Sequence, residues 1–468
     1  MSPQYLSPGV YVEEVERGAK PIEGVGTAVA AFVGFAERGP TQTPTLVTNW
    51  SQFVNTFGGF LPGFYLAHAV YGYFQNGGGS CYIVRLPTPE GVEKVAPAAE
   101  VALPSRAAAA LPTLRITAKE EGKAGEAITA EVAPPGAGAP EDQFTLIVRR
   151  GATQEVFENL TIGKAKGARN VAEVVTKESK LVRVEMLEAP GSLAERAPAP
   201  GTYSLTMPET KALAVKELQP LVFVGEAAAR SGVGGLEAVD EVTMLCAPDL
   251  MAGYKAGFLS KDTVKAVQLA MLAHCETMKD RFAILNCPPG LSPQEVKEWR
   301  VNEAGYDSKY GALYYPWIQV ANPLGNGAGI LVPPSGHIAG IYARSDRERG
   351  VHKAPANEVV RGALSLETQI TKGEQDILNP LGINCIRAFP GRGIRIWGAR
   401  TLSSDAAWRY INVRRLFNFV EESIEQGTQW VVFEPNDVDL WERVKRDVSA
   451  FLTRIWRDGA LFGRTPEE

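Results

Sequence analysis

Apolar runs typical of strands alternate with helical patterns along most of this chain. The runs at 27–35 and 81–86 indicate buried strands, and the segment 61–74 between them carries aromatic residues at helical spacing. The alternation resumes after residue 213, with strands expected at 221–224, 242–246, 282–285 and 314–320 and a helix at 261–280. Ser292 and Glu295 form a capping-box pattern that predicts the start of another helix. Strands separated by helices favour an α/β fold with a parallel or mixed sheet.

The composition changes between the two α/β stretches. Residues 88–139 are dominated by Ala, Pro, Glu and Gly, and short alternating strands follow at 144–148, 155–162 and 181–186. We therefore expect an inserted β-rich domain at 90–212, joined through flexible segments to a discontinuous α/β core domain of residues 21–89 and 213–355. The small content of large apolar residues further predicts that the insert packs little against the core.

The two ends of the chain differ from the core. Strands expected at 394–397 and 430–433, with helices at 405–426 and 440–457, predict a separate α+β domain of residues 356–468. Residues 1–20 contain a short alternating stretch, in which Val10, Val12 and Val15 lie on the apolar side and Tyr11 between them. A lone terminal strand is unstable unless it pairs with a sheet.

Charge and cysteine content exclude some classes of protein. The 468 residues include 48 Lys and Arg against 53 Asp and Glu, a net charge of −5, which gives no basic excess for nucleic acid. No apolar run reaches the ~20 residues of a membrane-spanning helix, so no membrane insertion is expected. The five cysteines are scattered without CxxC spacing, which indicates a reduced, cytosolic protein and offers no metal-binding pattern.

The search for catalytic motifs finds none of the common ones. A Walker phosphate loop, GxSxG, HExxH and the kinase signatures are all missing. His274 adjoins Cys275, but neighbouring helical residues point about 100° apart. An α/β hydrolase built on Asp249, Cys287, or the group Ser335, His337 and Asp346 remains an alternative, as does a surface or receptor-binding module. The segment 332–355 is interpreted as a solvated charged loop or contact surface.

Several segments together resemble the contractile phage tail sheath proteins. They are 5–14 (YLSPGVYVEE), 332–344 (VPPSGHIAGIYAR), 350–351, 353–357 (KAPAN), 378–384 (LNPLGIN), 396–402 (IWGARTL) and 410–415 (YINVRR). They span nearly the whole chain except the insert.

This resemblance implies a structural protein and no enzyme, with no catalytic residues, cofactor or metal. Its fold would be a subtilisin-like α/β core with the inserted β-rich domain and the C-terminal α+β domain. Subunits would form stacked hexameric rings and a helical sheath around an inner tube protein, with baseplate and tail terminator proteins as further partners. The sheath would assemble in the bacterial cytoplasm, belong to a virion tail or a released contractile particle, and contract to drive the tube through a target envelope.

The resemblance also implies roles for particular residues. The arm formed by Val10, Tyr11, Val12 and Val15 would pair with a neighbouring subunit's sheet. The charged loop of Arg344, Asp346, Arg347, Glu348 and Arg349 would exchange partners between subunits, and the helix carrying Arg409, Arg414 and Arg415 would face the inner tube. Family chains continue past the segment 459–463, so a chain ending at Glu468 would lack a C-terminal arm and would be mostly monomeric.

Overall fold

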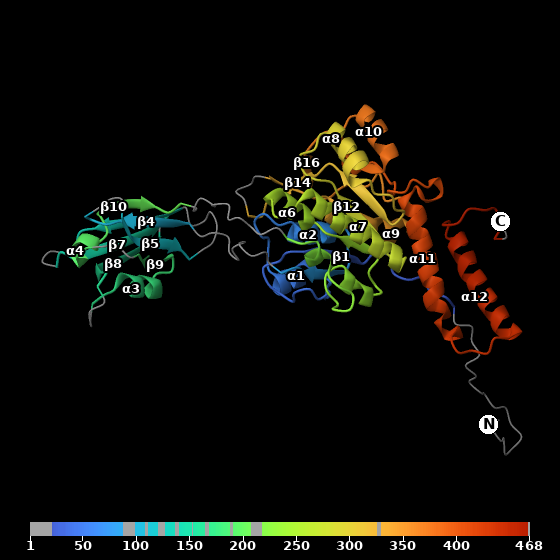
Figure 1. Cartoon of the computed structure of the whole chain (residues 1–468), viewed down its shortest axis with the longest axis horizontal. Coiled ribbons are helices and arrows are strands. Elements are labelled where there is room, and N and C mark those ends of the chain that lie inside the picture. The colour runs from blue at the N-terminus through green and yellow to red at the C-terminus, as the bar shows by residue number, and fades with distance from the viewer. Residues whose placement is uncertain are drawn as a thin grey trace, which may run out of the picture. The chain divides into compact units, whose positions relative to one another are not determined.

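The computed structural model describes residues 21–87, 99–107, 111–119, 127–135, 140–151, 153–163, 168–187, 191–206, 218–324 and 329–466. The chain divides into two compact units, residues 1–87 with 217–468, and residues 88–216. Each unit is described by itself. The segment 88–216 thus interrupts the first unit, between two strands of its sheet (Figure 1).

The first unit is built on an eight-stranded sheet within the described residues, in the order β18-β17-β13-β12-β11-β1-β3-β2. Its strands are β1 (Ala30–Gly34), β2 (Thr45–Val47), β3 (Cys81–Arg85), β11 (Met244–Cys246), β12 (Phe282–Asn286), β13 (Gly311–Tyr315), β17 (Ile383–Phe389) and β18 (Gly393–Ile396). The six central strands are parallel, and only the edge strands β2 and β18 are antiparallel to their neighbours. All residues of β1, β11, β12 and β13 are buried, as expected for parallel strands covered on both faces.

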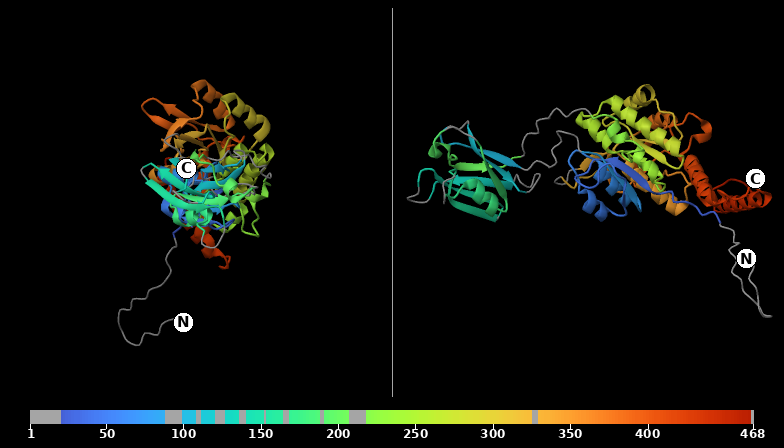
Figure 2. Two further views of the ribbon diagram at one scale, coloured as in Figure 1. Left: turned by 90° about the vertical axis from the view of Figure 1, so that its left-hand side faces the viewer. Right: turned by 60° about the horizontal axis from the view of Figure 1, so that its bottom comes forward.

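Helices cover both faces of this sheet (Figures 1 and 2). The helices of the unit are α1 (Trp50–Phe57), α2 (Leu66–Asn76), α5 (Leu221–Val224), α6 (Asp249–Ala256), α7 (Lys261–Met278), α8 (Pro293–Glu298), α9 (Ser335–Arg349), α10 (Lys372–Leu378), α11 (Ile411–Thr428) and α12 (Val438–Arg457). On one face α2 and α9 pack together, and Phe32 of β1 meets Tyr73 of α2 at a ring distance of 5.5 Å. The helices α6 and α7 pack against each other and against β1 and β12.

A smaller antiparallel sheet of β15 (Gly329–Val332), β14 (Ile318–Ala321) and β16 (Ala363–Leu366) adjoins β17. The strand expected at 314–320 is therefore two strands, β13 and β14, interrupted at the cis peptide before Pro316. The expected boundary at 355–356 coincides with no structural division, because β17 pairs with β13 and belongs to the main sheet.

Two expected strands are wrong. Residues 221–224 form the short helix α5, which ends at Gly225 with a φ of 61°. Residues 429–431 form a 3-10 turn and not part of a strand, and Phe433 after it is fully exposed with a φ of 74°. The capping box of Ser292 and Glu295 is confirmed at the start of α8.

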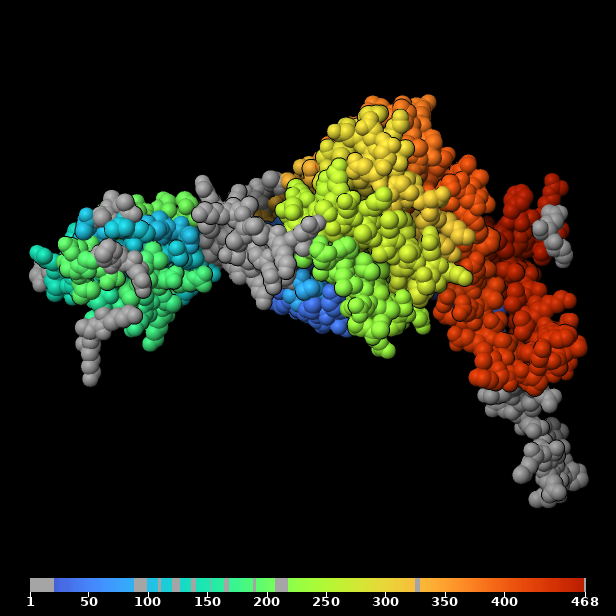
Figure 3. Space-filling view, viewed as in Figure 1, coloured from blue at the N-terminus to red at the C-terminus, as the bar shows by residue number. Residues whose placement is uncertain are grey.

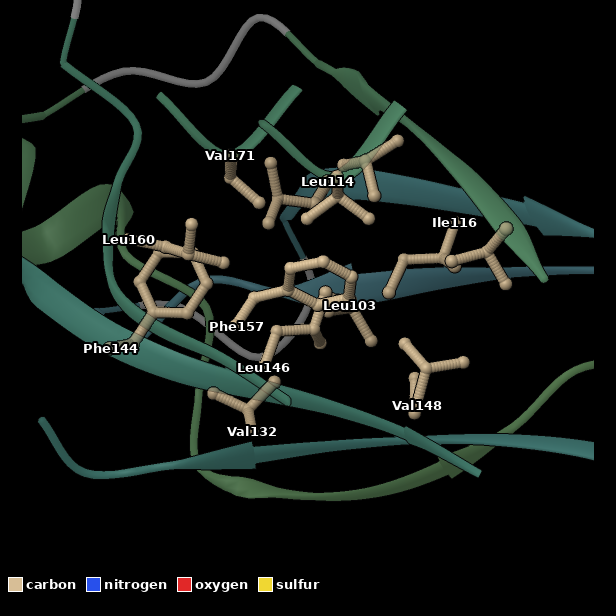
Figure 4. Packing of buried hydrophobic residues seen from close by; sticks show 14 of the residues in the cluster. Leu103, Leu114, Ile116, Val132, Phe144, Leu146, Val148, Phe157, Leu160 and Val171 are labelled. Atoms are coloured by element: carbon tan, nitrogen blue, oxygen red, sulfur yellow. The ribbon is translucent and has the colours of Figure 1, made fainter. Parts of the chain in front are cut away.

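The second unit has its own core. Its elements are β4 (Glu100–Pro104), β5 (Pro112–Ala118), β6 (Ile128–Ala133), β7 (Gln143–Arg150), β8 (Thr153–Thr161), α3 (Val171–Glu178), β9 (Val182–Met186), α4 (Leu193–Arg196) and β10 (Gly201–Ser204). They form one sheet in the order β10-β6-β7-β8 and another in the order β4-β5-β9. Phe144, Leu146 and Phe157 belong to the buried apolar cluster of this unit (Figure 4). Strands β4, β5 and β6 lie in the Ala- and Pro-rich stretch, for which the sequence analysis named no strand.

Candidate functional site

The side chains that suggested a hydrolase triad are held apart by the fold. Asn286 Nδ2 donates to Ser335 Oγ over 3.0 Å, and Ser335 N donates to Asn286 Oδ1 over 3.1 Å. The His337 ring lies against Gly72 of α2, and Asp346 binds Arg415. Since an α-helix rises about 1.5 Å per residue, Ser335 and Asp346 stand roughly 16 Å apart along α9. This separation excludes a triad of the three side chains.

Asp249 is a structural cap. The side chain is fully buried, and its carboxylate accepts hydrogen bonds from the backbone N–H groups of Phe35 (2.7 Å), Leu66 (3.2 Å) and Tyr65. Burial raises the pKa of this carboxyl to about 7, and the three N–H donors oppose that rise. The carboxylate ties the end of β1 to the start of α2.

The cysteine and histidine candidates are also occupied. Cys287 Sγ donates to the carbonyl oxygen of Tyr314 over 3.7 Å, and burial raises the pKa of this thiol far above its usual range. A thiol with a raised pKa forms little nucleophilic thiolate. His274 Nε2 lies 3.3 Å from Arg281 Nη1, and neighbouring Cys275 is a fully buried free thiol.

The interpretation of residues 332–355 as a charged loop is wrong for residues 335–349, because these form the helix α9. The first eleven residues of α9 are all buried, from Ser335 to Ser345. Arg344 is 3% exposed and donates to the carbonyl oxygens of Asn76 (3.0 Å) and Val359 (2.8 Å). These contacts lie within one chain, so Arg344 is not available as a surface charge.

The remaining members of the predicted charged loop are divided between the interior and the surface. Asp346 is buried in an ion pair with Arg415, and Arg347 Nη1 donates to the carbonyl oxygen of Gly77 over 3.1 Å. Glu348 and Arg349 are exposed at the last turn of α9. Only this last turn matches the expected surface of exposed charge.

Two of the three arginines expected to face a tube are buried. Arg414 is 1% exposed, and its guanidinium lies over the rings of Trp408 (4.4 Å) and Tyr310 (4.8 Å) while Nη2 binds Glu421 at 3.0 Å. Arg415 is 4% exposed. Arg409 is half-buried and lies before α11. Positive charge on the outer face of α11 is therefore a wrong expectation for Arg414 and Arg415.

The buried pair of Asp346 and Arg415 fixes the segment 21–29, which leads into β1. Arg415 Nη1 and Nη2 bind the two carboxylate oxygens of Asp346 at 2.9 and 2.6 Å, and Nη2 also donates to the carbonyl oxygen of Thr27 over 2.9 Å. Thr27 Oγ1 donates to Asp346 Oδ2 over 2.8 Å. Burial lowers the pKa of Arg415, but the charge and hydrogen bonds of Asp346 outweigh burial, so the pKa is raised. We call this cluster of Thr27, Asp346 and Arg415 the anchor triad.

Further contacts hold the same segment against the C-terminal helices. Ile22 packs with Leu416 of α11 and with Phe451 and Ile455 of α12, and its carbonyl oxygen accepts from Arg454 Nη2 over 2.7 Å. The Val25 backbone N–H donates to Ser423 Oγ over 3.1 Å. The helices α11 and α12 lie side by side at the C-terminal end of the colour range (Figures 1 and 3).

Glycine permits the close approach of this segment to α11. A Cβ at Gly24 would lie 2.8 Å from the Phe419 ring, and one at Gly427 would lie 2.8 Å from Ile22. Sequence reasoning missed these contacts. The available signal was the pattern in which Ile22 and Val25 alternate with glycines, as expected where a backbone lies close to a helix.

A groove borders the anchor triad. It encloses about 330 Å³, and its lining includes Val25, Thr27, Asp240, Glu241, Asp280, Arg415, Phe419, Glu422 and Gln426. The expected arm residues Val10, Tyr11, Val12 and Val15 lie outside the described residues. Within the described ranges, no helix is long and apolar enough to cross a membrane, and no group of His, Cys, Asp and Glu is arranged to hold a metal ion.

Comparison with known proteins identifies the class of this chain. Residues 238–402 match the phage tail sheath protein central domain, and residues 403–468 match the phage tail sheath C-terminal domain. The tail sheath protein of Burkholderia phage BcepMu is 25% identical, over 99% of this chain and 89% of that protein. The tail sheath protein of Escherichia phage P2 is 24% identical, over 43% of this chain and 50% of that protein.

Solved structures show the same fold. The helical sheath of the anti-feeding prophage (AFP) in its contracted state has a TM-score of 0.55 at 24% identity, covering 100% of this chain and 88% of that one. The sheath complex of an extracellular contractile injection system (PVC), also contracted, has a TM-score of 0.56 at 24% identity, covering 100% and 86%.

The mixed α/β, multidomain fold is thus that of tail sheath structures. The chain belongs to the phage tail sheath family. It is a structural subunit of a contractile tail sheath and not an enzyme, as the sequence resemblance predicted.

Proposed function

We propose that this chain forms stacked hexameric rings around an inner tube, and that contraction of the sheath drives the tube through a target envelope. The observation that best supports the proposal is the fixed segment 21–29. Its outer end adjoins residues 1–20, and its inner end continues into β1 at the centre of the sheet. An arm attached in this way joins neighbouring subunits without loosening either core. Contacts between unlike surfaces of this kind build open helical arrays.

A second observation supports assembly. Val432, Phe433, Val438 and Trp441, at and after the turn between α11 and α12, are 56% to 102% exposed. Exposed large apolar groups near one another are typical of surfaces that become covered in an assembly. In the proposal, neighbouring subunits or the inner tube cover them.

The proposal extends to partners and place. We infer that the subunit contacts copies of itself, an inner tube protein, and baseplate and tail terminator proteins, and that assembly takes place in the bacterial cytoplasm. The similar structures include the baseplate of AFP as well as its sheath. The subtilisin likeness of the core belongs to this proposal too.

Electron microscopy of the chain with its cognate tube and baseplate proteins tests the proposal. The chain alone is expected to be mostly monomeric, but with the tube and baseplate proteins to assemble on we expect striated sheaths around the tubes. A variant lacking residues 2–20 should remain folded by circular dichroism but form no sheath, because the arm is missing. A matched variant, in which a short Gly/Ser linker replaces residues 93–205, should still form sheaths. Bare tubes with the full chain, or normal sheaths without residues 2–20, would contradict the proposal.

A further inference from the structure

The lining of the groove beside the anchor triad is partly apolar and partly acidic. Val25 and Phe419 are among its apolar residues, and Asp240, Glu241 and Glu422 contribute carboxylates, which we call its acidic rim. Asp280 also lines the groove, and it is paired with buried Arg281 at 2.6 Å. Arg415, the cation of the lining, is already bound by Asp346. The rim therefore keeps an excess of negative charge.

The titration of one rim residue reflects this excess. The pKa of the Glu422 carboxyl is raised by burial first and then by the negative charges of Asp280, Glu425 and Asp240. The hydrogen bond from Gln426 opposes the rise and does not cancel it. A positive charge placed in the groove would relieve this repulsion.

A basic hairpin lies elsewhere on the same unit. Strands β17 and β18 pair from Ile386 to Phe389 with Gly393 to Ile396, whereas only Ile383–Cys385 of β17 pair with β13. The four residues 386–389 thus extend beyond the parallel sheet, by roughly 13 Å at 3.3 Å per residue.

The arginines of this hairpin are held by neutral groups. Arg392, exposed at the turn, lies over the rings of Phe389 (5.6 Å) and Trp397 (5.8 Å) and donates to Asn357 Oδ1 over 3.0 Å. Arg395 donates to the carbonyl oxygens of Asn357 (2.7 Å) and Arg392 (2.9 Å). Among the described residues, neither guanidinium has a carboxylate within ion-pair distance. Arg392 is thus an exposed cation held beside two aromatic rings.

The groove and the hairpin lie at opposite ends of the parallel strands of one sheet. The groove is lined by residues that directly precede β1, β11 and β12, namely Val25–Val29, Asp240–Thr243 and Asp280. The turn of the hairpin follows β17, which runs parallel to these strands through β13. Hence the groove lies at the amino ends of the parallel strands and the hairpin at their carboxyl ends. One chain cannot bring its own hairpin to its own groove.

We propose that the turn 389–393 of one subunit docks into the groove of a second copy, with Arg392 among Asp240, Glu241 and Glu422. A groove of about 330 Å³ has room for about ten waters at ~30 Å³ each, enough for a guanidinium and its stem. Because donor and acceptor are different surfaces at opposite ends of the parallel strands, the contact repeats from copy to copy and does not close into a dimer. The inference rests on the proposed sheath function, to which it adds a specific subunit contact.

Cysteine cross-linking tests the contact in the full chain. Pro390→Cys places a thiol at the turn, Gln426→Cys places one in the groove, and the five native cysteines are buried. The two variants, carrying different tags, are mixed and treated with a short bis-maleimide. We expect a cross-linked heterodimer. As a matched control, Arg183→Cys, on the exposed side of β9 in the other unit, should give at least about tenfold less product with Gln426→Cys.

Charge reversal sharpens the test. Adding Arg392→Glu to the Pro390→Cys chain should lower the cross-link yield several-fold, and adding Asp240→Arg to the partner chain should restore it. The yield should also fall in 1 M salt, where the Debye length is only about 3 Å. A yield equal to the control, or a yield insensitive to both reversals, would overturn the proposal.

The two proposals fail in different ways. Sheaths that form normally but never give the cross-link would refute the docked hairpin and leave the sheath function intact. If the cross-link forms between copies of the chain but no sheaths are ever made, the sheath function is refuted and the docked hairpin is supported. If the groove instead receives the tube protein, the cross-link appears only with that protein, which also refutes the contact between copies.

Discussion

Replacing Arg415 with Met tests whether the anchor triad fixes the segment before β1. The substitution keeps the apolar stem but leaves the Asp346 carboxylate, 4% exposed, with Thr27 Oγ1 as its remaining partner in the triad. It also removes the donor to the Thr27 carbonyl oxygen. Removing one member of a buried ion pair costs about 3–5 kcal/mol. At 1.4 kcal/mol per factor of ten, that is a roughly 100- to 4000-fold change in the local opening equilibrium.

Amide hydrogen exchange of residues 21–29 and of α11 measures this change. Protection should fall by about two to three orders of magnitude in Arg415→Met, while the amides of the unit 88–216 should keep theirs. Arg347→Met is the matched control, because this exposed arginine of α9 donates to the neutral carbonyl oxygen of Gly77 and, among the described residues, forms no ion pair. We expect a change of no more than about 0.5 kcal/mol there.

A double substitution separates the charge from the packing. In Asp346→Asn/Arg415→Met no unpaired charge remains buried, so much of the lost protection should return. If Arg415→Met lowers protection less than about threefold, or if the double variant is no better than the single one, the anchoring role of the pair is wrong.

The other predictions concern the cores of the two units. His337 has a pKa lowered to about 4 by burial and then by His68, so its contribution to stability is present above pH 6.5 and is lost as pH falls toward 4; this residue should lower the unfolding free energy by up to about 3 kcal/mol over that window, and His337→Leu should make the pH profile shallower while His68 and His274, whose pKa values are also lowered to about 4, keep part of the slope. Gly340→Ala should destabilise the α2–α9 contact by about 1–3 kcal/mol in denaturant titrations, because its Cβ would lie 2.4 Å from the Tyr73 carbonyl oxygen, whereas Gly373→Ala, in open space on α10, should be neutral or stabilising. Residues 88–216 expressed alone should melt cooperatively, and Phe144→Ala, in their buried cluster, should cost about 3–5 kcal/mol by calorimetry; a broad, non-cooperative melt of the fragment would contradict an independent core.

Local sequence patterns correctly predicted the strands and helices that have a regular pattern of apolar residues. The runs that became β1 and β11 are apolar throughout, those that became β3 and β12 are apolar up to their last residue, and α7 and α12 show helical spacing. The type of these elements could therefore be predicted without knowing what packs on them. The helix α9 could not be recognised in this way. It is buried along eleven residues and packs on α2 through Gly336 and Gly340, so no stripe of large apolar residues marks it.

The burial of Arg344 and Arg415 in contacts within the chain could not be predicted for a related reason. The partners of Arg344 lie at Asn76 and Val359, and the partner of Arg415 lies at Asp346, 69 residues away in sequence. A charge pattern shows that a guanidinium is present but not which distant carbonyl or carboxylate meets it. The strand predicted at 430–433 was wrong for a different reason. These residues favour β structure, but among the described residues they pair with no strand, and Phe433 is fully exposed.

The position of β1 determines how this unit responds to a mechanical load. A pull on residue 21 that is directed along the axis of β1 passes through the segment 21–29 and into this strand. Strands β3 and β11 flank β1 on both sides and run parallel to it, so the load shears both ladders at once. In shear all the hydrogen bonds of a ladder share the force, whereas at an edge pulled sideways they break one after another. Tension entering through this segment therefore meets the strongest direction of the sheet, and the anchor triad and α12 must yield before β1 is loaded.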